Sequence, residues 1–188
     1  MTVTELPWAL DGRGLQLIRV PPLALHALGE DNATLAMELE PNLLTPYLLG
    51  EECQGLWRYR SKQISGNPLD NAWITRIAVD ARTSTPVGLA GFHGRPDARG
   101  MVEIGYRIDP VFRRLGYART ALEILLDVAS RQSEVHIVRA TISPDNIASR
   151  NLISQYGFNE VGEQWDEEDG LETIFEVSAS QSVEAASG

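Results

Sequence analysis

The sequence of 188 residues has few of the residues that would indicate a metal, redox or secreted protein. It holds one cysteine, Cys53, which cannot form an internal disulfide, so we expect a reducing compartment, the cytoplasm. The three histidines, His26, His93 and His136, are scattered at spacings unlike those of metal-ligand pairs. We therefore expect no metal.

Long apolar runs and basic charge are also scarce. No apolar run approaches the roughly 20 residues that span a membrane, and the N-terminus lacks the basic and apolar regions of a signal peptide. The net charge of −10 argues against nucleic-acid binding, because nucleic-acid-binding domains usually present a basic surface. We expect neither a membrane nor a nucleic acid as a partner.

The acidic charge is concentrated at the C-terminal end of the chain. Residues 159–188 hold nine of the 26 acidic residues and none of the 16 lysines and arginines, the last of which is Arg150. The other 17 acids nearly balance the 16 bases over residues 1–158. The body of the chain is thus almost neutral, and the acidity belongs to its C-terminal segment.

Length and composition fit one globular domain. The hydrophobic share of 43% and the charged share of 22% are ordinary for a folded soluble chain. Neither a repeat nor a linker divides the sequence. We expect one domain over residues 1–177, followed by a disordered tail over residues 178–188, which are loose in composition.

Periodicity and turn residues predict an α+β fold. Strands with alternating or β-branched residues are expected at 15–20, 73–79, 87–93, 101–108, 135–142, 159–165 and 171–177. Helices are expected at 22–28, 33–40, 46–63, over about 18 residues after Pro110, and from Pro144 to a stop at Gly157. Short polar loops join the strands between 73 and 108, which therefore form an antiparallel meander. The result is a mixed, mostly antiparallel sheet of about seven strands flanked by helices.

The most informative stretch is VEIGYRIDPVFRRLGYARTALEILL, residues 102–126, in which a loop rich in arginine joins a strand to a helix. The first N–H groups of a helix have no intrahelical partner, and the helix dipole favours an anion there. Gly116 lets a ligand approach the backbone, and Arg113 and Arg114 add positive charge. The stretch predicts an anion site, with an ordinary solvated helix start as the alternative.

Two motifs resemble those of the GNAT family of N-acetyltransferases. Arg113–Ala118 reads Arg-x-x-Gly-x-Ala, as in the family's motif A, which binds the pyrophosphate of acetyl-CoA. Residues 143–158, SPDNIASRNLISQYGF, resemble the family's Asn-x-x-Ser…Leu…Gly-Phe segment. With Glu-Ile-Gly-Tyr on the preceding strand, they look most like the RimJ/RimL branch of ribosomal-protein N-terminal acetyltransferases. The resemblance is sharp over residues 101–163 and loose over residues 1–70.

This resemblance implies a single-domain GNAT fold in which the strand at 101–108 splays from the strand at 135–142 at the acyl-CoA site. It implies acetyl-CoA as cosubstrate and direct acetyl transfer, in a ternary complex, to a primary amine of a protein N-terminus or a small molecule. Backbone N–H groups near Tyr106, Arg107 and Ile108 would hold the pantetheine arm and the thioester oxygen. The pyrophosphate would be held by the loop residues Arg113, Arg114, Leu115, Gly116, Tyr117 and Ala118.

The resemblance also implies a general base at Glu103, where some family members carry a catalytic glutamate. The alternative is an ordinary residue on the solvent face of an alternating strand, and the two interpretations have equal standing. Acids of the final hairpin are rival bases, because this hairpin borders the acceptor side in the family: Glu163, Asp166, Glu167 and Glu168.

The thiolate leaves either with the help of an acid or without one, because a thiol pKa of about 8.5 makes it a tolerable leaving group. The family's tyrosine position holds Ile153, which cannot donate a proton, and Ser149 is the substitute that the RimJ/RimL branch suggests. Asn146 is either the N-cap of a helix or a ligand of the coenzyme. In the resemblance, Arg150 meets the adenosine 3′-phosphate of the coenzyme.

Catalytic competence, the roles of two tryptophans and the acceptor each have more than one interpretation. The departure at Ile153 motivates a second interpretation, a catalytically degenerate acyl-CoA-binding sensor or interaction module. Trp57 and Trp165 are core or rim residues, or else they line an acceptor pocket. The acceptor is not identified, although an acidic C-terminal hairpin would favour a cationic amine, and a homodimer remains possible.

Overall fold

The structure, a computed structural model, describes residues 6–167 and 170–180. Its contacts divide these residues into two compact units. The first unit holds the described residues up to Gly91 together with Tyr106–Ala121, and the second holds Phe92–Gly105 and the described residues from Leu122 onward. Strand β5 (Met101–Ile108) therefore begins in the second unit and ends in the first, whereas helix α4 (Tyr117–Ser130) runs from the first unit into the second.

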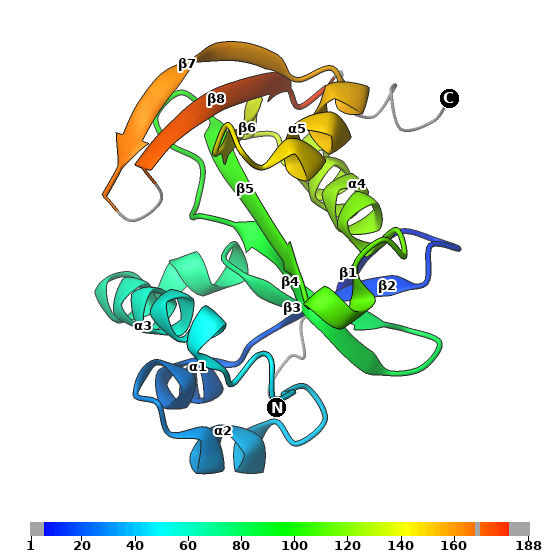
Figure 1. Cartoon of the computed structure of the whole chain (residues 1–188). Helices are drawn as coiled ribbons and strands as arrows, with labels where there is room; N and C mark the ends of the chain where they lie inside the picture. Colours follow the sequence, from blue (N-terminus) through cyan, green and yellow to red (C-terminus); the bar gives the residue numbers. More distant parts are fainter. Residues whose placement is uncertain (1–5, 168–169, 181–188) are drawn as a thin grey trace. The chain divides into compact units, whose positions relative to one another are not determined.

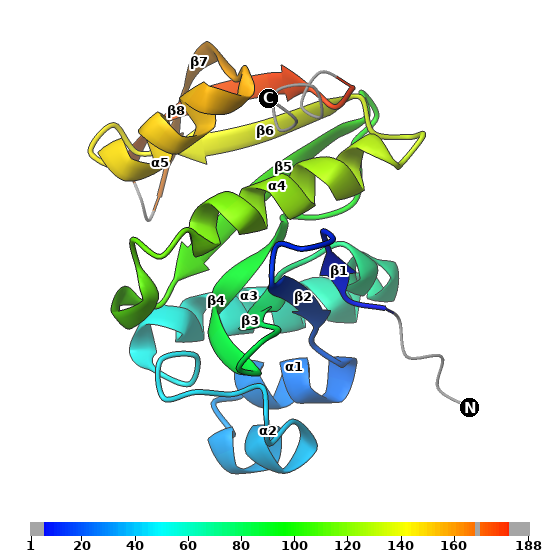
Figure 2. The same ribbon diagram turned by 90° about the vertical axis from the view of Figure 1, so that its right-hand side faces the viewer.

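The first unit combines four antiparallel strands with three helices (Figure 2). The strands pair in chain order and are β1 (Trp8–Ala9), β2 (Leu15–Arg19), β3 (Arg76–Asp80) and β4 (Thr85–Phe92). The helices are α1 (Pro22–Gly29), α2 (Ala33–Leu39) and α3 (Glu51–Gly66). Helices α1 and α3 lie close together, since a Cβ added at Gly29 would stand 2.4 Å from that of Ser61.

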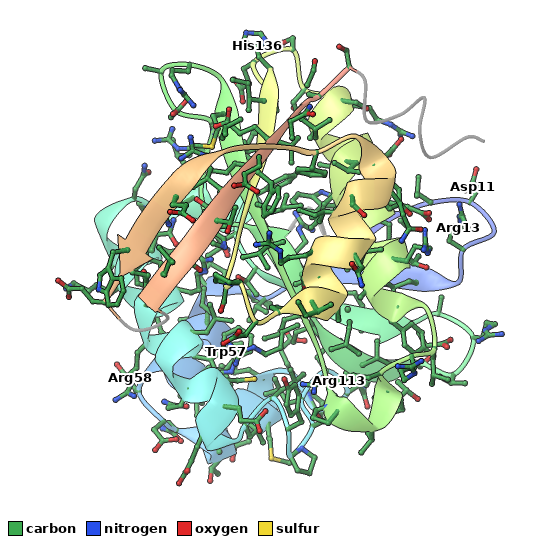
Figure 3. All side chains as sticks on the ribbon, turned by 45° about the horizontal axis from the view of Figure 1, so that its top comes forward. Asp11, Arg13, Trp57, Arg58, Arg113 and His136 are labelled. Atoms are coloured by element: carbon green, nitrogen blue, oxygen red, sulfur yellow. The ribbon has the colours of Figure 1, made fainter. Side chains whose placement is uncertain are left out.

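The core of the first unit contains one face of α3. Trp57 is fully buried there, and its Nε1–H donates to the carbonyl of Leu48 at 2.7 Å, whereas the next residue, Arg58, is exposed (Figure 3). Helix α3 begins at Glu51 rather than at the predicted residue 46. Glu51 and Glu52 occupy its first turn, where the helix dipole stabilises negative charge.

The second unit holds the rest of the sheet (Figure 1). Strand β6 (Ile137–Ile142) pairs antiparallel with β8 (Gly170–Ser178), and β8 pairs antiparallel with β7 (Asn159–Asp166) in the last hairpin. Helix α5 (Ile147–Ile153) continues as a 3-10 turn and ends at Gly157, whose φ of 75° suits glycine, as predicted. The tail was predicted over residues 178–188, but strand β8 reaches Ser178 and Ala179 is buried, because both continue the sheet and its packing. Residues 181–188 of the predicted tail lie outside the described residues.

The eight described strands follow the order β1-β2-β3-β4-β5-β6-β8-β7. Strands β5 and β6 are parallel and the other registered pairs are antiparallel, so the predicted α+β fold with a mixed, mostly antiparallel sheet is confirmed. The additional strand is β1, whose two residues are too few to show a periodicity. The predicted meander is the run β3-β4-β5.

The register between β5 and β6 is short. In the described chain it joins Met101–Glu103 to Ile137–Arg139, although β6 continues to pair with β8 as far as Ile142. Early separation of these two strands is the splay that the family resemblance implies.

Helix α4 begins later than its periodicity predicts. A 3-10 turn, Pro110–Phe112, follows Asp109, and α4 starts only at Tyr117. Between them the backbone takes a positive φ at Arg114 (64°) and at Gly116 (88°), which no α-helix accommodates. None of the described helices is long and apolar enough to cross a membrane.

Candidate active site

The loop Arg113–Ala118, here called the arginine loop, is held by the turn that precedes it and by the end of β5. The Asp109 carboxylate accepts from the N–H of Val111 at 3.0 Å, which fixes the turn before the loop. Arg113 Nε–H donates to the carbonyl of Ile108 at 3.1 Å. The next two residues, Arg114 and Leu115, are exposed. The loop is therefore fixed at its first residue, and the residues that follow present positive charge to solvent.

Gly116 opens the start of α4 to a ligand. A Cβ built at this position would meet no atom within 4 Å, so the space beside the backbone is clear. The first helical bond of α4 runs from Thr120 N–H to Gly116 C=O at 3.1 Å. The N–H groups of Tyr117 and Ala118 precede it and have no carbonyl of the helix to bind. These features fit an anion such as a pyrophosphate.

The first turn of α4 is tied to the strand β3 by a buried acid. The Tyr117 hydroxyl donates to Asp80 Oδ2 at 2.6 Å. Asp80 also accepts from the backbone N–H groups of Arg82 and Thr83, at 2.8 and 3.3 Å. These hydrogen bonds, that of Tyr117 foremost, lower the pKa of Asp80 from 3.8 to about 2, and the same bond raises the pKa of Tyr117. The strand expected from the sequence ends at residue 79, and no role was predicted for Asp80.

The end of β5 carries the three residues expected to hold the thioester. Ile108 is buried, Tyr106 is half-buried and Arg107 is exposed. Arg107 Nη1–H donates to the carbonyl of Glu52 at 2.5 Å. Burial raises the pKa of the Cys53 thiol, and the positive charge of Arg107 opposes this only in part. A buried thiol of raised pKa is a poor nucleophile, consistent with leaving Cys53 out of the chemistry.

The second unit holds a group of polar side chains on two neighbouring strands and on the residue that follows a third. Glu103 lies on β5, Thr141 lies on β6, and His93 directly follows β4. Thr141 Oγ1–H donates to Glu103 Oε1, and His93 Nδ1 lies 3.5 Å from the same oxygen. The predicted base thus has two side-chain neighbours, and sequence reasoning identified neither. The isolated histidine was the only available signal.

The predicted ligands on α5 are placed in the second unit. Asn146 Oδ1 accepts from Ser149 N–H at 3.1 Å, so the N-cap interpretation is confirmed, while a contact with the coenzyme stays a prediction. Arg150 Nη1–H donates to Thr173 Oγ1 at 2.9 Å, and its guanidinium lies 5.1 Å from the ring centre of Phe175. Its role at a phosphate also stays a prediction. Ser149 is half-buried.

The remaining candidates separate into core and surface. Ile153, at the family's tyrosine position, is buried in the second unit, as is Tyr156, whose hydroxyl donates to Glu123 at 2.7 Å. Trp57 is buried in the core of the first unit, and Trp165 on β7 is 76% exposed. The rival acids Glu163 and Glu167 are exposed, Asp166 is half-buried, and Glu168 lies outside the described residues. In the described chain, no group of three His, Cys, Asp or Glu side chains is arranged to hold a metal.

Comparison with protein families and curated proteins gives matches to acetyltransferases. The family profile described as "Acetyltransferase (GNAT) domain" matches residues 25–159. The chain is similar to the "Uncharacterized N-acetyltransferase YjdG" of Bacillus subtilis, with 36% identity over 72 residues, which are 38% of this chain and 43% of that protein. It is also similar to the "L-2,4-diaminobutyric acid acetyltransferase" of Streptomyces coelicolor, with 33% identity over 83 residues, or 44% and 49%. The matched segments thus cover less than half of these relatives.

Solved structures share the fold at low sequence identity. A spermidine N-acetyltransferase chimera from Vibrio cholerae and hSSAT has a TM-score of 0.64 and 17% identity, covering 90% of this chain and 98% of that chain. RimJ of Mycobacterium smegmatis, in complex with CoA-disulfide, has a TM-score of 0.61 and 19% identity, covering 96% and 93%. RimL, in complex with coenzyme A, has a TM-score of 0.62 and 15% identity, covering 92% and 98%.

Proposed function

The chain belongs to the GNAT acetyltransferase family, and we propose that it moves an acetyl group from acetyl-CoA to a primary amine. The observation that carries the proposal is the arginine loop, where Gly116 at a φ of 88° leaves open space beside the first N–H groups of α4. Those N–H groups, with Arg113 and Arg114, have the chemistry to hold the pyrophosphate of the coenzyme. When bound, the coenzyme supplies the thioester.

The remaining steps are assigned to the residues of the chain. Backbone N–H groups near Tyr106, Arg107 and Ile108 hold the thioester oxygen, on which negative charge develops as the amine attacks. Glu103 lies two residues before Gly105 on the same strand and provides the negative charge that favours removal of a proton from the acceptor ammonium. Ser149 is the proposed donor to the leaving sulfur.

The acceptor is proposed to be a cationic amine. The described part of the last hairpin carries the exposed acids Glu163 and Glu167, and negative potential attracts cations. The names of relatives and structural neighbours suggest acceptors to test: 2,4-diaminobutyrate and spermidine. A peptide with a free N-terminal alanine or serine is the third, since ribosomal-protein-alanine and ribosomal-protein-serine acetyltransferases of Vibrio share the fold. The single, buried cysteine supports a cytoplasmic location, and a homodimer remains a proposal.

The test is release of free thiol from acetyl-CoA in the presence of these acceptors, followed by detection of the acetylated product by mass spectrometry. We expect thiol release that depends on both enzyme and acceptor. Binding of coenzyme A, measured by calorimetry, serves as the independent readout. Absence of both binding and release would end the proposal.

A catalytically degenerate acyl-CoA-binding module is the second candidate. The observation in its favour is Ile153, which is 1% exposed and therefore part of the core rather than a proton donor. This candidate predicts tight coenzyme binding with no thiol release for any acceptor. The two functions are thus separated by the same pair of measurements.

A further inference from the structure

The polar group of the second unit is built from two neighbouring strands and the residue that follows a third. His93 N–H donates to the carbonyl of Glu103 at 2.7 Å, so these two residues stand opposite each other and their side chains share one face of the sheet. Glu103 is paired in register with Arg139 on β6, and Thr141 lies two residues further along β6 on the same face. We call His93, Glu103 and Thr141 the proton row.

Within the proton row, the carboxylate is the fixed member. Glu103 Oε1 accepts from the Thr141 hydroxyl and lies 3.5 Å from His93 Nδ1. The side chain of Glu103 is 21% exposed, and that of His93 is 47% exposed. The imidazole is therefore the more accessible end of the row, and the carboxylate behind it is held in place.

The position of the imidazole depends on a glycine of β5. A Cβ added at Gly105 would stand 2.8 Å from His93 Nε2, a distance that real Cβ atoms essentially never show. The ring thus lies over Gly105, which directly precedes Tyr106, the first of the residues proposed to hold the thioester. Any other residue at position 105 would displace the ring from this place.

A carboxylate is the charged group that faces the imidazole ring most closely. The Glu103 carboxylate faces it from β5, and the neutral Thr141 hydroxyl reaches that carboxylate from β6. Arg139, in register with Glu103, pairs with Glu176 at 2.6 Å. Glu176 also pairs with Arg99 at 3.3 Å, and Arg99 lies 3.8 Å from Asp97, so the two cations and two anions of this cluster offset each other. An imidazolium beside a carboxylate 3.5 Å away is stabilised by their attraction.

We propose that His93 takes the proton from the acceptor amine, and that Glu103 is a positioning residue that acts through His93. The proposal rests on the acetyl transfer proposed above. One proton of the acceptor ammonium passes to His93 Nε2 and from there to water. The free amine forms the C–N bond as the C–S bond breaks, and the second proton lost by the nitrogen ends on the sulfur. Glu103 stabilises the transient imidazolium at Nδ1.

The test compares His93→Gln, Glu103→Gln and the double variant with the wild type. Because a general base contributes about 10²–10⁴ in rate, we expect His93→Gln to lower kcat by at least about 100-fold, with the KM for acetyl-CoA unchanged. Glu103→Gln should lower kcat by only about tenfold. The double variant should be no slower than His93→Gln, since both changes disable one step.

The matched control is His136→Gln. His136 is exposed in the same unit and lies over Gly100, with its ring 2.6 Å from a Cβ built there, much as His93 lies over Gly105 (Figure 3). We expect wild-type kcat from this variant.

The pH dependence of His93→Gln gives a second readout. Without the base, the enzyme must take up acceptor that is already deprotonated in solution. Its rate should therefore rise tenfold per pH unit below the pKa of the acceptor.

Two results would overturn the proposal. One is a larger loss of kcat in Glu103→Gln than in His93→Gln, which would make Glu103 itself the base. The other is additive losses in the double variant. A different outcome is that the wild type binds coenzyme A but acetylates no acceptor, in which case the proposed function fails. The contact between His93 and Glu103 is then tested by an NMR titration of the His93 ring. Its titration midpoint should be lower in Glu103→Gln than in the wild type, and an unchanged midpoint would show that Glu103 does not act on the ring.

Discussion

The arginine loop and the proton row differ in how they are built. The loop consists of six consecutive residues whose shape is set by the backbone, with positive φ at Arg114 and Gly116. The row consists of two side chains from neighbouring strands and His93, which directly follows β4. Thr141 lies 38 residues from Glu103 in sequence. An anion can be held by backbone N–H groups, which every residue except proline has, whereas proton transfer requires particular side chains. The first region therefore tolerates many side chains, and the second tolerates few.

The largest effect should come from Gly116→Glu. The new side chain adds negative charge at the proposed pyrophosphate site and strains a backbone with a φ of 88°. We expect coenzyme A affinity to fall by more than about 100-fold, the equivalent of roughly 2.7 kcal/mol. The measurement is calorimetric titration with coenzyme A.

The control for this change is Gly55→Glu on α3. Gly55 is also exposed, and a Cβ there also meets nothing within 4 Å, but its φ is not positive. Its affinity should equal that of the wild type. If Gly116→Glu and Gly55→Glu bind coenzyme A with equal affinity, the arginine loop does not take part in coenzyme binding, and its contrast with the proton row fails.

Gly105→Ala tests the proton row without touching its charges. The added methyl group must push the His93 ring aside, and displacement of a reacting group by about 1 Å costs up to about 10²-fold in rate. We expect kcat to fall between about 10- and 100-fold, with unchanged coenzyme affinity. Steady-state kinetics with the best acceptor gives the answer.

The matched control here is Gly162→Ala on β7, because Gly162 is also a strand glycine of the second unit and has open space beside it. It should retain wild-type kcat. A wild-type rate in Gly105→Ala would mean that the ring position over β5 is irrelevant to turnover.

Asp80→Asn tests the anchor of the arginine loop. Loss of a charge-assisted hydrogen bond to Tyr117 should lower coenzyme A affinity by about fivefold to tenfold.

The same variant should change the pH dependence of stability. The pKa of Asp80 in the folded protein is about 2, below its ordinary 3.8, so its contribution to stability is present above pH 3.8 and is lost as pH falls through 2. The stability difference between wild type and variant should thus shrink as pH falls below 4.

Urea unfolding at several pH values between about 6 and 3 measures this difference. The exposed acid Asp11 provides the control variant Asp11→Asn, for which we expect little change in stability at any pH (Figure 3). A stability difference for Asp80→Asn that stays constant with pH would show that its carboxylate makes no charge-dependent contribution.

The smallest effect should come from reversing charge on the last hairpin. The double change Glu163→Lys and Glu167→Lys should raise the KM of a cationic acceptor by about threefold, since exposed charges act weakly and are screened by salt. The effect should vanish at about 0.5 M salt. Glu30→Lys with Glu38→Lys, at exposed acids of the first unit, is the control. An unchanged or lower KM would remove the hairpin from acceptor recognition.

Local features of the molecule were predictable from the sequence. The arginine loop, the stop of the last helix at Gly157 and the N-cap at Asn146 each depend on a few neighbouring residues and their preferred backbone angles. The order of strands and helices also followed from the periodicity of the chain. The later start of α4 was missed, because helical spacing continues through residues whose φ values interrupt the helix.

Contacts between distant segments were not predictable. Nothing near Tyr117 in the sequence indicates that Asp80, 37 residues earlier, accepts its hydroxyl proton in a hydrogen bond. Alternation placed Glu103 on the polar face of its strand, but its neighbours His93 and Thr141 depend on the register of three strands. Register is set by how whole strands pack, and a slip of one residue would turn every side chain to the opposite face. The sequence by itself therefore determined the arginine loop, which is predicted to bind an anion, and only the tertiary structure decided which side chains stand beside the predicted base.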